Sequence, residues 1–130
     1  MDSSADSRYA RVISSLANLM NAAVIVTDLD GRLLMATDRA VKLLGAEDES
    51  EIVGKSGFDW LAPEDRQAAL NNLLNVAEKG SKKNQRYVLT QENGSKQQIE
   101  LDSALMRLPD GQPEGFVLVI RSIGEPEEDP

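Results

Sequence analysis

The sequence predicts an α+β fold, a five-stranded antiparallel sheet with helices on one face and an extra helix flanking it at the N-terminus. Short apolar, β-branched segments occur in two groups, one near each end of the chain. Asp-Gly or Asn-Gly turns follow strands in both groups, within "DLDG", "ENGS" and "PDGQPEG". The clearest helical pattern lies between the groups. Because hairpin-length turns join neighbouring strands, we expect them to pair antiparallel, with the helices segregated to one side.

The N-terminal part reads as a polar tail over residues 1–7, expected to be disordered, and a flanking helix over residues 8–22. Apolar residues recur at helical spacing and give this helix one apolar stripe: Tyr9, Val12, Ile13, Leu16, Leu19 and Met20. Two strands are predicted next, at 23–28 and 32–36, joined by "DLDG".

The middle of the chain is predicted to be helical and its last third to be β. "TDRAVKLLG" reads as a short helix closed by Gly45, and one helical turn is expected at 49–53. A longer helix begins at Pro63, whose position and following acids favour a helix start, and ends at Gly80. Strands are predicted at 85–91, 97–107 and 116–123. The main domain therefore spans 23–124, and residues 125–130 read as an acidic linker or chain end.

Composition narrows the possible functions. The net charge of −8 argues against a nucleic-acid groove, which needs clustered Lys and Arg. The chain has no Cys and no His, so thiolate or imidazole metal sites and the corresponding nucleophilic chemistry are not expected. No apolar run is long enough to span a bilayer, and the polar N-terminus does not resemble a signal peptide. We therefore expect a cytoplasmic domain with no membrane contact in this segment.

The motif "DLDG" raises an enzymatic alternative, because Asp-based phosphohydrolases also place Asp-x-Asp-Gly after an apolar strand. Arg32 occupies the position where those enzymes have Thr, and the predicted sheet is antiparallel rather than parallel. We therefore interpret Asp28 as the end of a strand and Asp30-Gly31 as a bend. No catalytic residue and no metal site is predicted.

The order of the motifs resembles that of PAS domains, the sensory modules of two-component kinases and other signalling proteins, over about residues 15–125. The matching segments are "TDLDGRLLMAT", "DRAVKLLG", "EIVGKSGFDWLAPEDR" and "YVLTQENGSKQQIELDSALMRLPDGQPEGFVLVIRSIGE". Three positions depart from the family pattern: Asp38 replaces Asn, Asn93 replaces a hairpin Asp, and Ser122 replaces the Asp of the last strand. The last departure removes the side chain that the resemblance assigns to the output contact.

The resemblance implies a small pocket between the helical middle and the inner face of the sheet. Strand alternation selects the side chains that would line it: Ile25, Thr27, Tyr87, Leu89, Ile99, Leu101, Phe116, Leu118 and Ile120. The alternative is that these side chains fill the core and leave no cavity.

Family cofactors can be weighed by residue type. Covalent flavin and coumarate need a Cys, and haem-binding members generally use an axial His, so all three are disfavoured. Non-covalent flavin needs amide side chains at the ring edge, whereas the inward residues named above are almost all apolar. No cofactor is therefore expected, and an apolar metabolite or no ligand fits better.

These observations predict a non-catalytic PAS sensor or interaction domain of a larger signalling protein, with a histidine kinase as the commonest context. It would sense a small apolar ligand or relay partner contacts to an output domain. The apolar stripe of the N-terminal helix predicts a homodimer. The alternative is a pure dimerisation module with a filled core.

Overall fold

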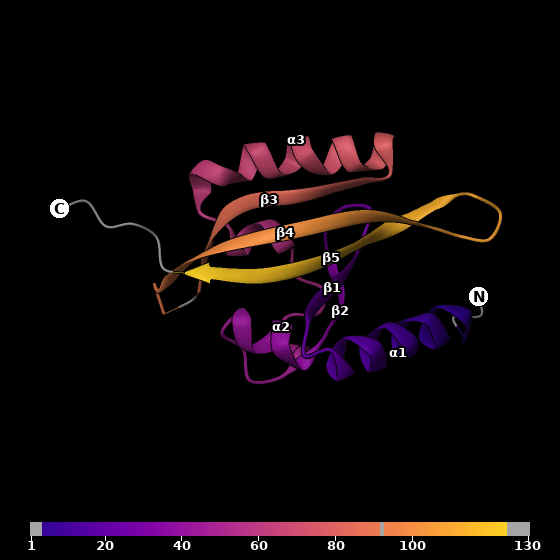
Figure 1. Cartoon of the computed structure of the whole chain (residues 1–130), viewed down its shortest axis with the longest axis horizontal. Coiled ribbons are helices and arrows are strands. Elements are labelled where there is room, and N and C mark those ends of the chain that lie inside the picture. The colour runs from indigo at the N-terminus through magenta and orange to yellow at the C-terminus, as the bar shows by residue number, and fades with distance from the viewer. Residues whose placement is uncertain (1–3, 92, 125–130) are drawn as a thin grey trace.

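The computed structural model describes residues 4–91 and 93–124, with side chains described from residue 11 onward. The described residues form five strands, three α-helices and two short 3₁₀ helices, and the strands and α-helices are labelled in Figure 1. In chain order they are α1 (Ser4–Leu19), β1 (Ala23–Asp28), β2 (Leu33–Ala36), α2 (Asp38–Leu43), η1 (Glu49–Glu51), η2 (Gly57–Trp60), α3 (Pro63–Lys79), β3 (Ser81–Thr90), β4 (Lys96–Arg107) and β5 (Pro113–Gly124).

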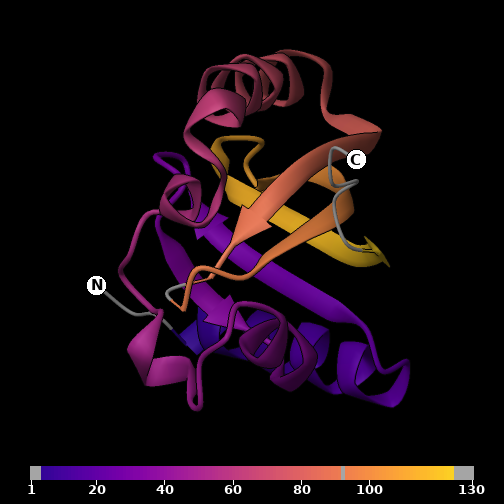
Figure 2. The same ribbon diagram turned by 90° about the vertical axis from the view of Figure 1, so that its left-hand side faces the viewer.

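The strands form one antiparallel sheet in the order β2-β1-β5-β4-β3. The two groups of strands meet where β1 pairs with β5 along its whole length, from Ala23 opposite Ile120 to Asp28 opposite Gly115. This pairing places the first and last strands side by side in the middle of the sheet, as Figure 2 shows. The predicted α+β fold and its antiparallel sheet are confirmed.

One face of the sheet carries the main core. The segment from α2 to α3 covers this face, with α2 packing against β1 and β2, and α3 against β3 and β4. The core side chains come from alternate strand positions such as Ile25, Leu89 and Ile99, and from the covering helices. Val24 and Val26, which alternate with these residues on β1, are buried on the other face.

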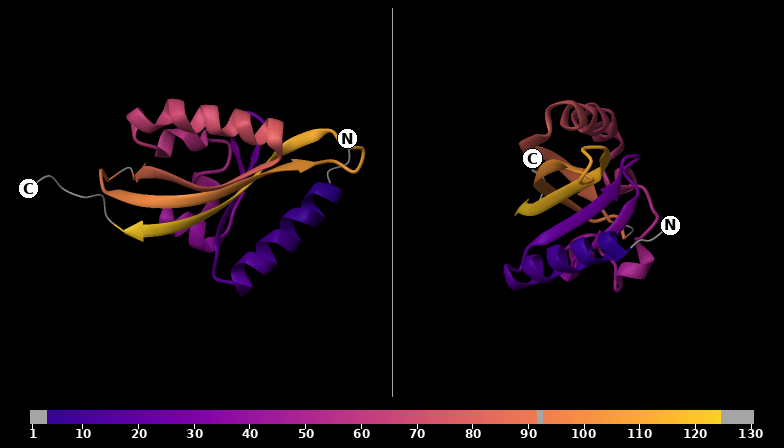
Figure 3. Two further views of the ribbon diagram at one scale, coloured as in Figure 1. Left: turned by 45° about the horizontal axis from the view of Figure 1, so that its top comes forward. Right: turned by 90° about the vertical axis from the view of Figure 1, so that its right-hand side faces the viewer.

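The N-terminal helix differs from its prediction at both ends. It begins at Ser4, so residues 4–7, which were expected to belong to a disordered tail, are helical, and it ends at Leu19. Small and acidic residues suit the first turn of a helix, which explains the earlier start. Figures 1 and 3 show α1 and α3 on opposite sides of the long β3–β4–β5 ribbon. Among residues 4–91 and 93–124, no helix combines the length and apolar character needed to cross a membrane.

The third strand also starts earlier than predicted, at Ser81 directly after Gly80. Its first residues pair with the end of β4, and this pairing overrides their low β-propensity. The register then shifts between Lys82 and Gln85, where Asn84 adopts a positive φ of 60°. Such a bulge inserts extra backbone into one strand and redirects the side chains that follow. It therefore fixes which face of the sheet Gln85 occupies.

Candidate functional site

A cavity lies between the sheet and the helices that cover it. Its volume is about 90 Å³. All strands contribute to its wall, and η2 and α3 supply the side chains opposite them: Phe58, Trp60, Ala69 and Leu73. The wall is mostly apolar, and none of the lining residues carries a formal charge.

The structure places most of the residues selected by strand alternation around this cavity. Eight of the nine predicted residues line the cavity: Ile25, Thr27, Tyr87, Leu89, Ile99, Leu101, Leu118 and Ile120. Phe116, the ninth, is not among the lining residues. It pairs with Thr27 and Leu105 nearer the β4–β5 turn and is only 2% exposed, so it fills the core beyond the cavity.

The pocket was expected to face the helical middle of the chain, but no residues were predicted for that side of the wall. Trp60 and Leu61 are buried at the end of η2, and Leu61 forms an isolated bridge with Leu89. Phe58 also lies against the turn after β1, since a Cβ built on Gly31 would stand 2.9 Å from its Cε2 atom. The residues from 44 to 62 form short irregular elements without a clear period, so the sequence offered only the aromatic run "FDW" as a signal.

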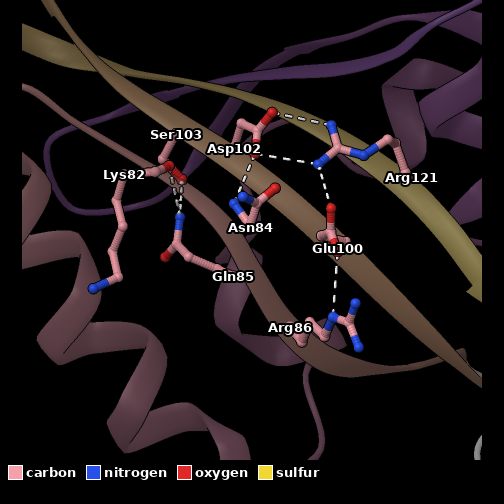
Figure 4. Close-up of polar contacts among 8 residues, drawn as sticks. All are labelled: Lys82, Asn84, Gln85, Arg86, Glu100, Asp102, Ser103 and Arg121. Carbon is pink, nitrogen blue, oxygen red and sulfur yellow. Dashed lines mark hydrogen bonds and ion pairs between the residues drawn. The ribbon is translucent and has the colours of Figure 1, made fainter.

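Two polar side chains in the cavity wall were also missed. Gln85 on β3 and Ser103 on β4 are 7% and 4% exposed. The Gln85 Nε2 atom donates to the Ser103 Oγ atom at 3.0 Å and to the Lys82 carbonyl at 3.3 Å. Both contacts are drawn in Figure 4. The signal was available, because Gln85 and Ser103 continue the same alternation that selected Tyr87 and Leu101.

The polar chain continues through Tyr87 to the covering helix. The Tyr87 hydroxyl donates to the Gln85 Oε1 atom at 3.0 Å and accepts from the Asn72 Nδ2 atom of α3 at 2.5 Å. Burial raises the pKa of Tyr87, with a smaller contribution from the nearby Asp65 carboxylate, while the Asn72 contact acts in the opposite direction. The phenol therefore stays neutral and protonated at physiological pH.

The opposite face of the same strands carries an ion network, shown in Figure 4. Arg121 on β5 donates to Glu100 at 2.9 Å and to Asp102 at 3.0 Å, and Arg86 on β3 donates to Glu100 at 3.2 Å. The hydrogen bond from Arg121 is the main cause that lowers the pKa of both carboxyl groups, and the same hydrogen bonds, to Asp102 first and then Glu100, raise the pKa of Arg121. Asp102 also accepts the backbone N–H of Asn84 at the bulge. The network thus connects β3, β4 and β5 through side-chain contacts.

Asp28 lies in a turn. Its Oδ1 atom accepts the backbone N–H of Asp30 at 2.9 Å and of Arg32 at 3.0 Å. Gly31 has a φ of +86°, which glycine adopts without strain. This geometry agrees with the interpretation of "DLDG" as a bend. Within residues 4–91 and 93–124, no cluster of three or more His, Cys, Asp or Glu residues suits a metal ion.

The apolar stripe of α1 is largely uncovered. Val12, Leu16, Leu19 and Met20 are 54%, 55%, 85% and 74% exposed, whereas Ile13 is partly buried. The side chain of Tyr9 lies outside the described residues. Ala17, one helical turn after Ile13, is buried.

Comparison with known proteins agrees with this architecture. The PAS fold family matches residues 7–123. A PAS domain from Colwellia psychrerythraea superimposes with a TM-score of 0.75 at 18% identity, covering 87% of this chain and 98% of that one. A light-oxygen-voltage domain studied with a flavin analogue gives a TM-score of 0.73 at 18% identity, covering 88% and 86%.

A third similar structure is the PAS-B domain of Drosophila melanogaster Cycle with bound ethylene glycol. Its TM-score is 0.69 at 17% identity, and the match covers 78% of this chain and 99% of that one. At such identities these structures establish the fold alone. A search of curated proteins gave no match. Since the family match spans most of the chain and agrees with the sheet order and helix placement, the chain belongs to the PAS family of sensory and interaction modules.

Proposed function

We propose that this chain is a non-catalytic sensor domain that binds one small, mainly apolar molecule in the cavity. The observation that carries the proposal is the cavity itself, about 90 Å³ inside an otherwise well-buried core. Natural cores leave few spaces larger than a water molecule, so an apolar pocket of this size is a candidate ligand site.

The size and chemistry of the cavity favour a metabolite-sized ligand over a large cofactor. A tricyclic flavin ring needs far more room than this cavity offers. The similar light-oxygen-voltage domain was studied with a flavin analogue, but this chain has no Cys to which a flavin could be attached. The ethylene glycol bound to the similar PAS-B domain is closer in size to what this cavity accommodates.

Signal transmission would follow a population shift. Ligand binding would favour one packing of the sheet against its covering helices, and the flanking helix would pass the change to a partner. We propose that α1 mediates a homodimer through Val12, Leu16, Leu19 and Met20, because apolar side chains this exposed favour a partner surface. The wider proposal is a cytoplasmic signalling protein with an attached output domain, such as a two-component histidine kinase.

The exposed stripe on α1 also favours a second candidate, a dimerisation module that senses no small molecule. The two candidate functions differ in whether the cavity binds a small molecule. Methyl-labelled NMR with dissolved toluene distinguishes them, because a cavity ligand shifts the methyl signals of lining residues. We expect shifts at Leu89, Leu101 and Ile120, and none at Leu74, which is 62% exposed on α3. Absence of shifts at the lining residues would leave only the dimerisation module.

A further inference from the structure

We infer that the ligand is a neutral molecule whose single hydroxyl or carbonyl group contacts Ser103, while the rest of the molecule is apolar. The inference rests on the proposed function, since it specifies what the cavity binds. It follows from the direction of each hydrogen bond in the chain from Asn72 through Tyr87 and Gln85 to Ser103.

The orientation of the Gln85 amide is determined by its neighbours. The Lys82 carbonyl can only accept, so the group that faces it must be the Nε2 donor. The Oε1 atom then faces the Tyr87 hydroxyl, which must donate to it. The Tyr87 oxygen in turn accepts from the Asn72 amide nitrogen, so every link in the chain has one direction.

This direction leaves the Ser103 hydroxyl with an unused hydrogen. The Ser103 Oγ atom accepts from Gln85, and among residues 11–91 and 93–124 its own hydrogen has no acceptor. Ser103 is 4% exposed and lines the cavity. Buried donors are normally paired, so this hydrogen fits an acceptor oxygen supplied from within the cavity. Within the part of the chain that the structure describes, the Gln85 Oε1 atom accepts only from Tyr87, so its second lone pair can accept from a ligand hydroxyl.

The lack of positive charge in the cavity wall disfavours an anionic ligand. None of the lining residues is cationic, and the Asp65 carboxylate already acts on Tyr87. A carboxylate or phosphate would be desolvated there without a positive partner. A neutral hydroxyl or carbonyl meets the Ser103 donor without that penalty, and an apolar body suits the remaining wall.

Phenol and toluene test the inference, because they differ only by a hydroxyl in place of a methyl group. NMR titration measures both affinities for the wild-type protein, for Ser103→Ala and for Ser81→Ala, an exposed serine that serves as the matched control. Loss of one hydrogen bond should lower the ratio of phenol to toluene affinity about fivefold in Ser103→Ala. The ratio should not change in Ser81→Ala. Ser103→Cys, whose thiol donates weakly, should lower the ratio as well and covers the case in which the alanine variant does not fold.

The outcomes separate this inference from the proposed function. If both probes bind in the cavity and the ratio is the same in wild type and the Ser103 variants, the Ser103 assignment is wrong while the sensor proposal stands. If neither probe binds the wild type, both are wrong. Benzoate tests the charge argument separately, and we expect it to bind much more weakly than phenol. Benzoate affinity equal to that of phenol would overturn the neutral-ligand assignment.

Discussion

Replacing Leu118 with Trp tests whether the cavity can accommodate a larger side chain. Leu118 lines the cavity from β5 and packs against the main core. Trp adds about six heavy atoms to the side chain, and the cavity beside Leu118 has a volume of about 90 Å³. The larger side chain should therefore fit with a change of less than about 1 kcal/mol in the free energy of unfolding, and it should abolish toluene binding.

Ile52→Trp is the matched control, because Ile52 has a side chain of similar size and is 2% exposed in the same core without lining the cavity. Overpacking there should cost about 1–3 kcal/mol. Urea denaturation of wild type and both variants gives the three free energies directly. If Leu118→Trp is as destabilising as Ile52→Trp, the core is closed and the sensing argument is refuted.

Three further predictions concern the sheet and the flanking helix. Gly115→Ala should lower the free energy of unfolding by about 3 kcal/mol or more, because its Cβ would lie 2.0 Å from a backbone carbonyl oxygen of β1. Gly54→Ala is the control, because Gly54 has open space around it and a φ of +89°, and it should cost only about 1 kcal/mol. Thermal melts of both variants check this, and equal losses would contradict the clash. Arg121→Gln should lower stability at pH 7 but not near pH 2. Because the pKa values of Glu100 and Asp102 are lowered in the folded state, their contacts with Arg121 contribute stability above the usual carboxyl pKa of about 4, and this stability is lost as the pH falls through the lowered pKa values. Urea denaturation at both pH values checks this, and an equal loss at both would point to packing instead. Val12→Glu with Leu16→Glu should give a monomer by light scattering, whereas a monomeric wild type or a dimeric variant would rule out the α1 interface.

Periodicity predicted the regular elements because their physical causes are local. The hairpin turns at Asp30-Gly31 and Asn93-Gly94 limited which strands could be neighbours, and strand alternation then identified eight residues of the cavity wall. Gln85 and Ser103 follow the same alternation, but their polar side chains do not fit the apolar pattern that identifies a core face.

Other features depend on contacts between distant segments. The bulge at Asn84 is stabilised by Asp102, 18 residues away, and neither residue alone signals it. The covering residues Phe58 and Trp60 take their positions from a 3₁₀ turn too short to show a period. Whether a partner covers the stripe on α1 depends on a second molecule, which the sequence of one chain does not specify.

Native mass spectrometry of freshly purified protein tests the central claim most directly, because it weighs the domain together with anything retained in its cavity. The account predicts that the wild type carries the mass of one small molecule per chain, which denaturation releases, and that Leu118→Trp carries none. The two proteins should also differ after incubation with toluene, with an adduct only on the wild type. If wild type and Leu118→Trp both show only the mass of the polypeptide, before and after toluene, the domain does not sense a small molecule through this cavity.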